Sequence, residues 1–219
     1  MASTGKTQLR RAPPRLYLVT PLVGEAGRFA AALGAAVGGA DVASVLLRLK
    51  PDGERALINH IKALAAVVQP KGVALLLDGH AALAARAGAD GAHLTGIDAF
   101  TAEGQSLRPA RIAGCGGLAT RHDAMLAGER GADYVMFGEP DGAGRRPSFE
   151  AILQRIEWWA ELFEIPCVGC AATLGEVGLL AEAGADFVAI GDALWDDPRG
   201  PAAAIVDVAA RLKPRELVP

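Results

Sequence analysis

A segment near the carboxyl end of the chain, AGADFVAIGD at Ala183–Asp192, has two shorter relatives upstream. They are AGADGAHL at Ala87–Leu94 and RGADYVMFG at Arg130–Gly138. In each copy a helix-like stretch ends at a glycine, an Ala-Asp pair makes the turn, and a short apolar strand follows. Successive copies are separated by the length of about two strand–helix units. A repeated helix–turn–strand unit predicts parallel strands joined by crossover helices.

Eight short apolar runs resemble strands, and each is followed by a helical stretch. We expect the strands at Arg15–Thr20, Asp41–Lys50, Val73–Leu77, Gly91–Leu94, Arg111–Ala113, Asp133–Phe137, Cys167–Cys170 and Phe187–Ile190. We expect the helices at Gly24–Val37, Asp52–Gln69, Gly79–Ala87, Ala99–Gln105, Thr120–Arg130, Ser148–Phe163, Leu174–Ala183 and Pro201–Leu212. This strict alternation predicts an α/β fold, a (β/α)₈ TIM barrel. A doubly wound open sheet is the alternative, although its usual glycine fingerprint after the first strand is missing.

The chain shows no internal boundary, so we expect a single domain. Residues 15–219 would form the barrel. Residues 1–14, which are polar and basic and include Pro13 and Pro14, would form a flexible tail. A chain of 219 residues is near the lower end of the size range for such barrels, which requires short loops.

Composition and charge narrow the choice of partners. Hydrophobic residues make up 51% of the chain and charged residues 21%, so a substantial core can form. The formal net charge of −3 argues against nucleic acid or an anionic membrane as the main partner. No segment resembles a transmembrane span or a signal sequence, so we expect a cytoplasmic protein. Of the adjacent Trp158 and Trp159 on one expected helix, one can enter the core while the other stays partly outside, and the outer one with Leu162 is a candidate for a contact between copies in a homo-oligomer.

Two cations close the second strand. Arg48 and Lys50 are separated by one residue, so they share a face of the strand, and Leu47 and Leu49 take the other face. The active site of a barrel lies at the carboxyl ends of its strands. Two cations at that rim need an anion, which predicts a phosphate or pyrophosphate ligand. The alternative is that the strand ends before them and that water solvates both.

Carboxylates and histidines follow the third and fourth strands. Asp78 and Asp98 end consecutive strand–helix units and could together hold Mg²⁺, although either could instead cap the helix that follows it. His80 is a candidate for proton transfer. His93 is a second such candidate, with a hydrogen-bonded core histidine as the alternative.

Cysteines and glycines give weaker signals. Cys167 and Cys170 form a C-x-x-C, but on a strand they point to opposite faces, so we expect small buried residues rather than a metal or redox site. The glycines at 114–117 and Gly191 lie at strand ends just before helices, where a helix N-terminus could bind phosphate. Tight turns require the same residues.

The order of these motifs resembles the thiamine phosphate synthase/TenI family. The motifs are LYLVT, an R-x-K that closes the second strand, LLLDG, GADGAHL, GADYVMFG, IPCVGC and AGADFVAIG. The resemblance extends from about Arg15 to Arg211 and implies a (β/α)₈ barrel. It also implies an activity in which hydroxymethylpyrimidine pyrophosphate is joined to a thiazole phosphate with release of pyrophosphate. In this family Mg²⁺ and basic residues hold the pyrophosphate.

The resemblance assigns roles to particular positions. Arg48 and Lys50 match the cations of the family motif Q-x-R-x-K, and Asp98 matches a metal ligand. We assign phosphate or pyrophosphate binding to Arg48, Lys50, Arg145, Gly169 and Gly191. We assign Mg²⁺ binding to Asp98 and Asp78, and catalysis to His80 and His93.

Several family site residues are replaced in this chain. Leu46 stands in place of the Gln, Gly79 in place of the first metal ligand, and Ala171-Ala172 in place of a phosphate-binding Gly-Gly. The loop after the sixth strand carries Glu139 and Asp141, which would repel pyrophosphate.

These replacements leave three hypotheses open. The first is a thiamine phosphate synthase-like transferase with a diverged site. The second is a metal-independent TenI-like thiazole tautomerase, since those enzymes also carry a glycine at the position of Gly79. The third is a barrel that binds a ligand without catalysis.

Overall fold

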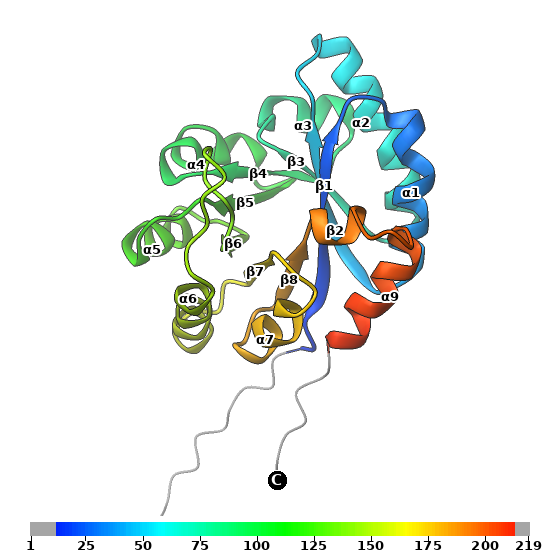
Figure 1. Ribbon diagram of the computed structural model, residues 1–219. Coiled ribbons are helices and arrows are strands. Elements are labelled where there is room, and N and C mark those ends of the chain that lie inside the picture. Colours follow the sequence, from blue (N-terminus) through cyan, green and yellow to red (C-terminus); the bar gives the residue numbers. More distant parts are fainter. Residues whose placement is uncertain (1–11, 213–219) are drawn as a thin grey trace, which may run out of the picture.

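The polypeptide forms a closed barrel of eight parallel strands in chain order, and β8 pairs with β1 (Figure 1). The computed structural model describes residues 12–212. The strands are β1 (Arg15–Val23), β2 (Val42–Leu49), β3 (Ala74–Asp78), β4 (Gly91–Thr95), β5 (Ile112–Gly116), β6 (Tyr134–Phe137), β7 (Cys167–Ala171) and β8 (Phe187–Ile190). The predicted TIM barrel is confirmed, and the open-sheet alternative is wrong because the sheet closes. Most of the predicted tail, residues 1–11, lies outside the described part of the chain.

Helices surround the barrel on its outer side (Figure 1). They are α1 (Ala26–Gly38), α2 (Glu54–Val68), α3 (Ala81–Ala87), α4 (Ile97–Glu103), α5 (Arg121–Glu129), α6 (Phe149–Leu162), α7 (Glu176–Glu182), α8 (Asp192–Trp195) and α9 (Pro201–Arg211). The strict alternation that we predicted is wrong after β8, where the short α8 precedes α9. A capping box begins α5, with Thr120 and Asp123 each accepting from the other's backbone N–H. Within residues 12–212 no helix is both long enough and apolar enough to span a membrane.

The three sequence repeats close the amino-terminal end of the barrel. In each, the glycine after a helix has a positive φ, as at Gly88 (φ 75°). The aspartate two residues later accepts a hydrogen bond from a backbone N–H of a neighbouring strand. These bonds run from Leu75 to Asp90 (2.7 Å), from Ala113 to Asp133 (2.8 Å) and from Cys167 to Asp186 (2.8 Å). The repeat therefore connects neighbouring strands at the end opposite to the site, where such residues serve stability.

We expect Asp90→Ala to lower the free energy of unfolding by about 2 kcal/mol, because a buried backbone N–H then loses a charged acceptor. Asp90 also accepts from the Gln69 side chain at 3.0 Å. Urea unfolding of Asp90→Ala and Asp90→Asn measures the effect. The asparagine keeps an oxygen acceptor and should lose less. Equal losses in the two variants would contradict this role for the hydrogen bond.

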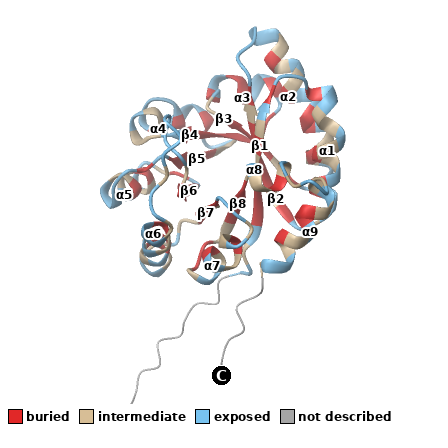
Figure 2. Ribbon diagram, viewed as in Figure 1, coloured by how far each residue is buried: buried red, intermediate tan, exposed pale blue. Residues whose placement is uncertain are grey.

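Side chains of alternate strand residues form two separate cores. Those that point inward fill the barrel: Tyr17, Leu46, Leu76, Tyr134, Met136, Val168 and Ala189. Those that point outward pack under the helices, and Figure 2 shows buried positions along the strands and the inner faces of the helices. Cys167 belongs to the outer core and Cys170 to the inner one, which confirms that they face opposite ways. Leu47 and Leu49 also lie in the outer core, as predicted.

Strand β1 does not end before Pro21, as the sequence had suggested, but continues to Val23. The ladder between β1 and β2 shifts register between Val19 and Leu22. Proline fits at such an irregularity, because no ladder hydrogen bond needs its missing N–H. The buried Thr20 hydroxyl accepts from Arg48 N at 3.0 Å and donates to the Pro21 carbonyl at 2.9 Å. The hydrogen bond from Arg48 N to Thr20 holds the backbone of Arg48 near the carboxyl end of β2.

Candidate active site

The carboxyl ends of β2 and β3 bring a cation and a carboxylate together. Arg48 Nε lies 3.7 Å from Asp78 Oδ2, and both side chains are partly exposed. Burial raises the pKa of Asp78, and the nearby Glu139 carboxylate adds to this, whereas His93 and Arg48 oppose it. We assigned Asp78 to metal binding and Arg48 to phosphate binding. The structure shows that the two side chains are neighbours.

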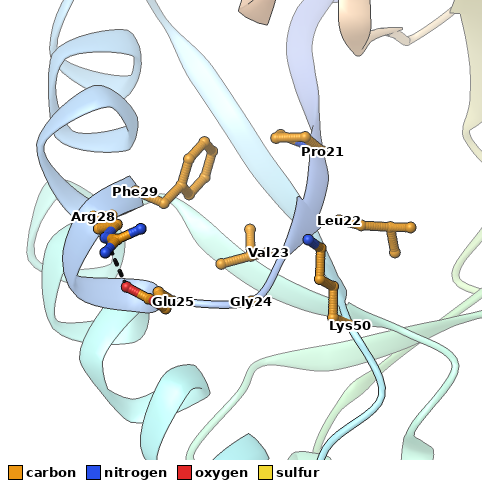
Figure 3. A pocket seen from close by; sticks show the side chains of 8 residues that line it. All are labelled: Pro21, Leu22, Val23, Gly24, Glu25, Arg28, Phe29 and Lys50. Atoms are coloured by element: carbon orange, nitrogen blue, oxygen red, sulfur yellow. Dashed lines mark ion pairs between the residues drawn. The ribbon is translucent and has the colours of Figure 1, made fainter.

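Lys50 follows β2 and lines a pocket of about 410 Å³ beside the end of β1. Figure 3 shows its side chain next to Leu22, across the pocket from Phe29 and the ion pair between Glu25 and Arg28 (2.8 Å). Lys50 is exposed, so its side chain is accessible to an anion that enters this pocket.

A chain of hydrogen bonds runs from the interior of the barrel to its mouth. The Tyr17 and Tyr134 hydroxyls are 2.8 Å apart, and Tyr134 is 2.9 Å from His93 Nδ1. His93 Nε2 lies 2.8 Å from Glu139 Oε1, and Gly117 N donates to Glu139 Oε2 at 2.8 Å. His93 is fully buried, whereas the Glu139 side chain is 15% exposed, so the carboxylate is the member of the pair that reaches the mouth.

Burial and pairing determine the charges of these hydrogen-bonded side chains. Burial alone would lower the pKa of His93, but the charge and hydrogen bond of Glu139 raise it. Burial alone would raise the pKa of Glu139, but His93 and Gly117 N lower it. Between pH 4.5 and pH 6.5 the pair is therefore ionised, as His93⁺ and Glu139⁻. Burial raises the pKa of both Tyr17 and Tyr134, so their hydroxyls stay protonated.

Glycines on β5 make room for these hydrogen-bonded side chains. A methyl group at Gly116 would overlap the Glu139 carboxylate and lie 2.5 Å from His93 Nε2. A methyl group at Gly114 would overlap the Tyr134 ring. From the sequence we interpreted these glycines as a turn or a phosphate-binding loop. In the structure their lack of a side chain leaves space for His93, Tyr134 and Glu139.

The remaining candidate residues are not gathered into one site. His80 is exposed and precedes α3 with φ of 50°. Arg145 is exposed and pairs with Asp141 at 2.8 Å. Gly169 lies within β7, where a methyl group would be 2.8 Å from Ile156 Cδ1, so its lack of a side chain serves packing against α6. Gly191 directly precedes α8.

Two charged residues after β6 and β7 form a partly buried ion pair that we did not predict. Arg146 Nη2 lies 2.9 Å from Glu176 Oε2. Its neighbour Arg145, and not Arg146, was among the residues assigned to phosphate binding. Glu176 gave no sequence signal, because an acidic residue in the first turn of a helix is a common stabilising feature.

The donor set at the mouth can be compared with the needs of Mg²⁺, which the resemblance implies. In phosphate-handling sites Mg²⁺ is held by one or two carboxylates together with phosphate oxygens and water. Asp98 is exposed in the first turn of α4, whereas Asp78 faces Arg48. Within the described residues, no three His, Cys, Asp or Glu side chains are grouped as metal ligands. One exposed carboxylate, that of Asp98, would leave most of the ligands of a Mg²⁺ to substrate oxygens and water.

Comparison with known proteins agrees with the motifs. The family model described as thiamine monophosphate synthase matches residues 16–194. The thiamine-phosphate synthase of Rhodospirillum centenum is 42% identical over 197 residues, which cover 88% of this chain and 95% of that protein. The corresponding protein of Hyphomonas neptunium is 36% identical, covering 87% and 90%.

Solved structures agree on the fold. The thiamine phosphate pyrophosphorylase of Pyrococcus furiosus has a TM-score of 0.73 at 19% identity, covering 90% of this chain and 95% of that one. The 3-hexulose-6-phosphate synthase of Salmonella typhimurium has a TM-score of 0.68 at 18% identity, covering 90% and 98%. With the family model and the relatives above, the motifs, the closed barrel and the cations at its mouth lead to one conclusion: this chain belongs to the thiamine monophosphate synthase family.

Proposed function

We propose that this protein joins hydroxymethylpyrimidine pyrophosphate to a thiazole phosphate in thiamine biosynthesis and releases pyrophosphate. One observation carries the proposal: two cations lie at one edge of the barrel mouth, with Asp78 beside Arg48, and a carboxylate lies across from them. Arg48 and Lys50 lie at the end of β2, and the Glu139 carboxylate follows β6, four strands away and so across the barrel. A bond that breaks into an anion and a cation is helped by charges placed in this way.

The residues divide the work of the reaction. Arg48 and Lys50 bind the pyrophosphate group and stabilise it as the carbon–oxygen bond breaks and the electron pair leaves with pyrophosphate. Glu139, kept ionised by His93 and Gly117 N, faces the positive charge that develops on the methylene carbon of the pyrimidine. The thiazole nitrogen then donates its lone pair to that carbon and becomes positively charged. No proton has to leave the thiazole nitrogen, so His93 acts through the position and charge of Glu139.

Mg²⁺, when bound, would add positive charge to the pyrophosphate oxygens. Asp98 is the residue that would hold it, and Asp78 would hold Arg48 in place. Lys50 lies beside the end of β1, whereas Asp78 on β3 lies beside Arg48. Lys50 would then bind the part of the pyrophosphate that is farther from β3.

A metal-independent isomerase is the second candidate. The buried His93–Glu139 pair supports it, since moving a proton on a thiazole requires a positioned acid–base group. Gly79, which stands where the synthases have a metal ligand, supports it as well.

A pyrophosphate-release assay separates the candidates. We supply the pyrimidine pyrophosphate with a thiazole acceptor, either the phosphate or the alcohol, with and without Mg²⁺. Release should require Mg²⁺, and Asp98→Asn should raise the Mg²⁺ concentration needed for half-maximal release by about tenfold, which corresponds to about 1.4 kcal/mol of lost binding. Glu103→Gln, at the other end of α4, is the matched control.

Each other outcome also decides between the candidates. Isomerisation of a thiazole carboxylate phosphate without Mg²⁺ and without release would support the isomerase. Ligand binding with neither reaction, in protein that is folded by circular dichroism, would leave a non-catalytic barrel.

A further inference from the structure

TIM barrels frequently bind a substrate phosphate between the loops that follow β7 and β8, next to a short extra helix. This chain has each of those parts. β7 ends at Ala171, β8 ends at Ile190, and α8 is the short extra helix. These loops can bind a phosphate only if their backbone N–H groups are not already hydrogen-bonded to another acceptor.

A carboxylate of the protein already occupies the loop after β7. Glu176 Oε2 accepts from Ala172 N at 2.8 Å, and Glu176 Oε1 accepts from Arg146 Nη1 at 3.0 Å. A backbone N–H together with an arginine fork is the kind of donor set that binds phosphate oxygens. The side chains of Arg146 and Glu176 are 18% and 16% exposed, so the pair is largely shielded from water.

Each nitrogen of the Arg146 guanidinium already has a partner within the protein. Its Nε donates to the Gly138 carbonyl at 3.0 Å, and its Nη2 donates to the Cys170 carbonyl as well as lying 2.9 Å from Glu176. The guanidinium thus connects the loop after β6 to the end of β7. A phosphate at this place would have to displace Glu176 or lie against its negative charge. Asp192, in the first turn of α8, adds a second negative residue to the loop after β8.

We propose that Glu176 is a specificity-determining residue that fills the position of the acceptor phosphate, so that this chain uses an unphosphorylated thiazole alcohol about as well as a thiazole phosphate. The inference rests on the proposed transferase function and names its acceptor class. The bonds are the same for both acceptors: the carbon–oxygen bond to pyrophosphate breaks and the carbon–nitrogen bond to thiazole forms. The acceptor phosphate takes no part in either change, so its loss affects binding only.

The test compares the two acceptors by pyrophosphate release at saturating pyrimidine pyrophosphate and Mg²⁺. In the unaltered protein the two values of kcat/KM should agree within about threefold, which is less than 1 kcal/mol. Glu176→Gln keeps the shape of the side chain and removes its charge, which leaves Arg146 without an anion. It should lower KM for the thiazole phosphate by about tenfold and leave KM for the alcohol unchanged. Glu182→Gln, exposed on the same helix, should change neither value.

Titration with inorganic phosphate tests the same inference without turnover. Glu176→Gln should bind phosphate more tightly than the unaltered protein does, and Glu176→Gln combined with Arg146→Gln should not. A more than tenfold preference of the unaltered protein for thiazole phosphate, or unchanged acceptor and phosphate affinities in folded Glu176→Gln, would overturn the proposal. Absence of release with both acceptors would overturn the proposed function instead, and the phosphate titration would still decide the role of Glu176.

Discussion

Arg48→Ala should lower kcat/KM for pyrophosphate release by about 100-fold or more, which is the typical effect of removing one group that stabilises the departing anion. The Arg48 guanidinium is the part of the β2 cation pair that lies beside Asp78, at 3.7 Å, and Thr20 fixes its backbone. Steady-state kinetics over a range of both substrates measures the effect. Because the group acts on charge that develops as the bond breaks, kcat should fall more than KM rises.

The variants around Arg48 separate charge from geometry. Arg48→Lys keeps the charge but loses the planar fork, so we expect an intermediate rate. Arg86→Ala removes an exposed arginine that pairs with Glu54 on the outer helices, and it should leave kcat/KM unchanged. If Arg48→Ala retained full activity in folded protein, Arg48 would have no role in holding pyrophosphate.

Glu139→Gln should lower the free energy of unfolding by about 2 kcal/mol near pH 6, because it leaves the buried His93 without its anionic partner. The same variant should lower kcat, since the negative charge that faces the developing carbocation is gone. Urea unfolding across pH tests the first effect, and the release assay tests the second. Glu161→Gln, an exposed glutamate on α6, is the control for both.

The difference in unfolding free energy between the unaltered protein and Glu139→Gln should depend on pH, and the two pKa shifts give its sign. The pKa of His93 is raised above its ordinary 6.5, so its contribution is complete below 6.5 and is lost as pH rises through the folded value. The pKa of Glu139 is lowered below its ordinary 4.5, so its contribution is complete above 4.5 and is lost as pH falls through the folded value. The stability difference between the unaltered protein and Glu139→Gln should thus be largest between pH 4.5 and pH 6.5. A difference that stays constant from about pH 5 to about pH 9 would show that the pair is not ionised in the fold.

Sequence alone determined the barrel, because the signals that specify it are local. Strand and helix periods, the glycine at a helix end and the capping residues Thr120 and Asp123 all act within a few neighbouring residues. The repeated aspartates, such as Asp90, marked the turns, and the spacing of the repeats made the strands parallel. Strand alternation placed Arg48 and Lys50 on one face, and their position in the apolar run placed them at the carboxyl end of β2.

Tertiary structure decided which side chains meet at the mouth. His93 is 41 residues from Tyr134 and 46 from Glu139, so only closure of the barrel brings the three together. The sequence around Gly116 does not predict this contact, because the space beside Gly116 is filled by His93 and Glu139, which are distant in the sequence. The contact of Glu176 with Arg146, 30 residues away, likewise joins two loops whose local patterns are ordinary. Local periodicity specifies where a chain turns, whereas burial and charge pairing across the barrel specify what its active site contains.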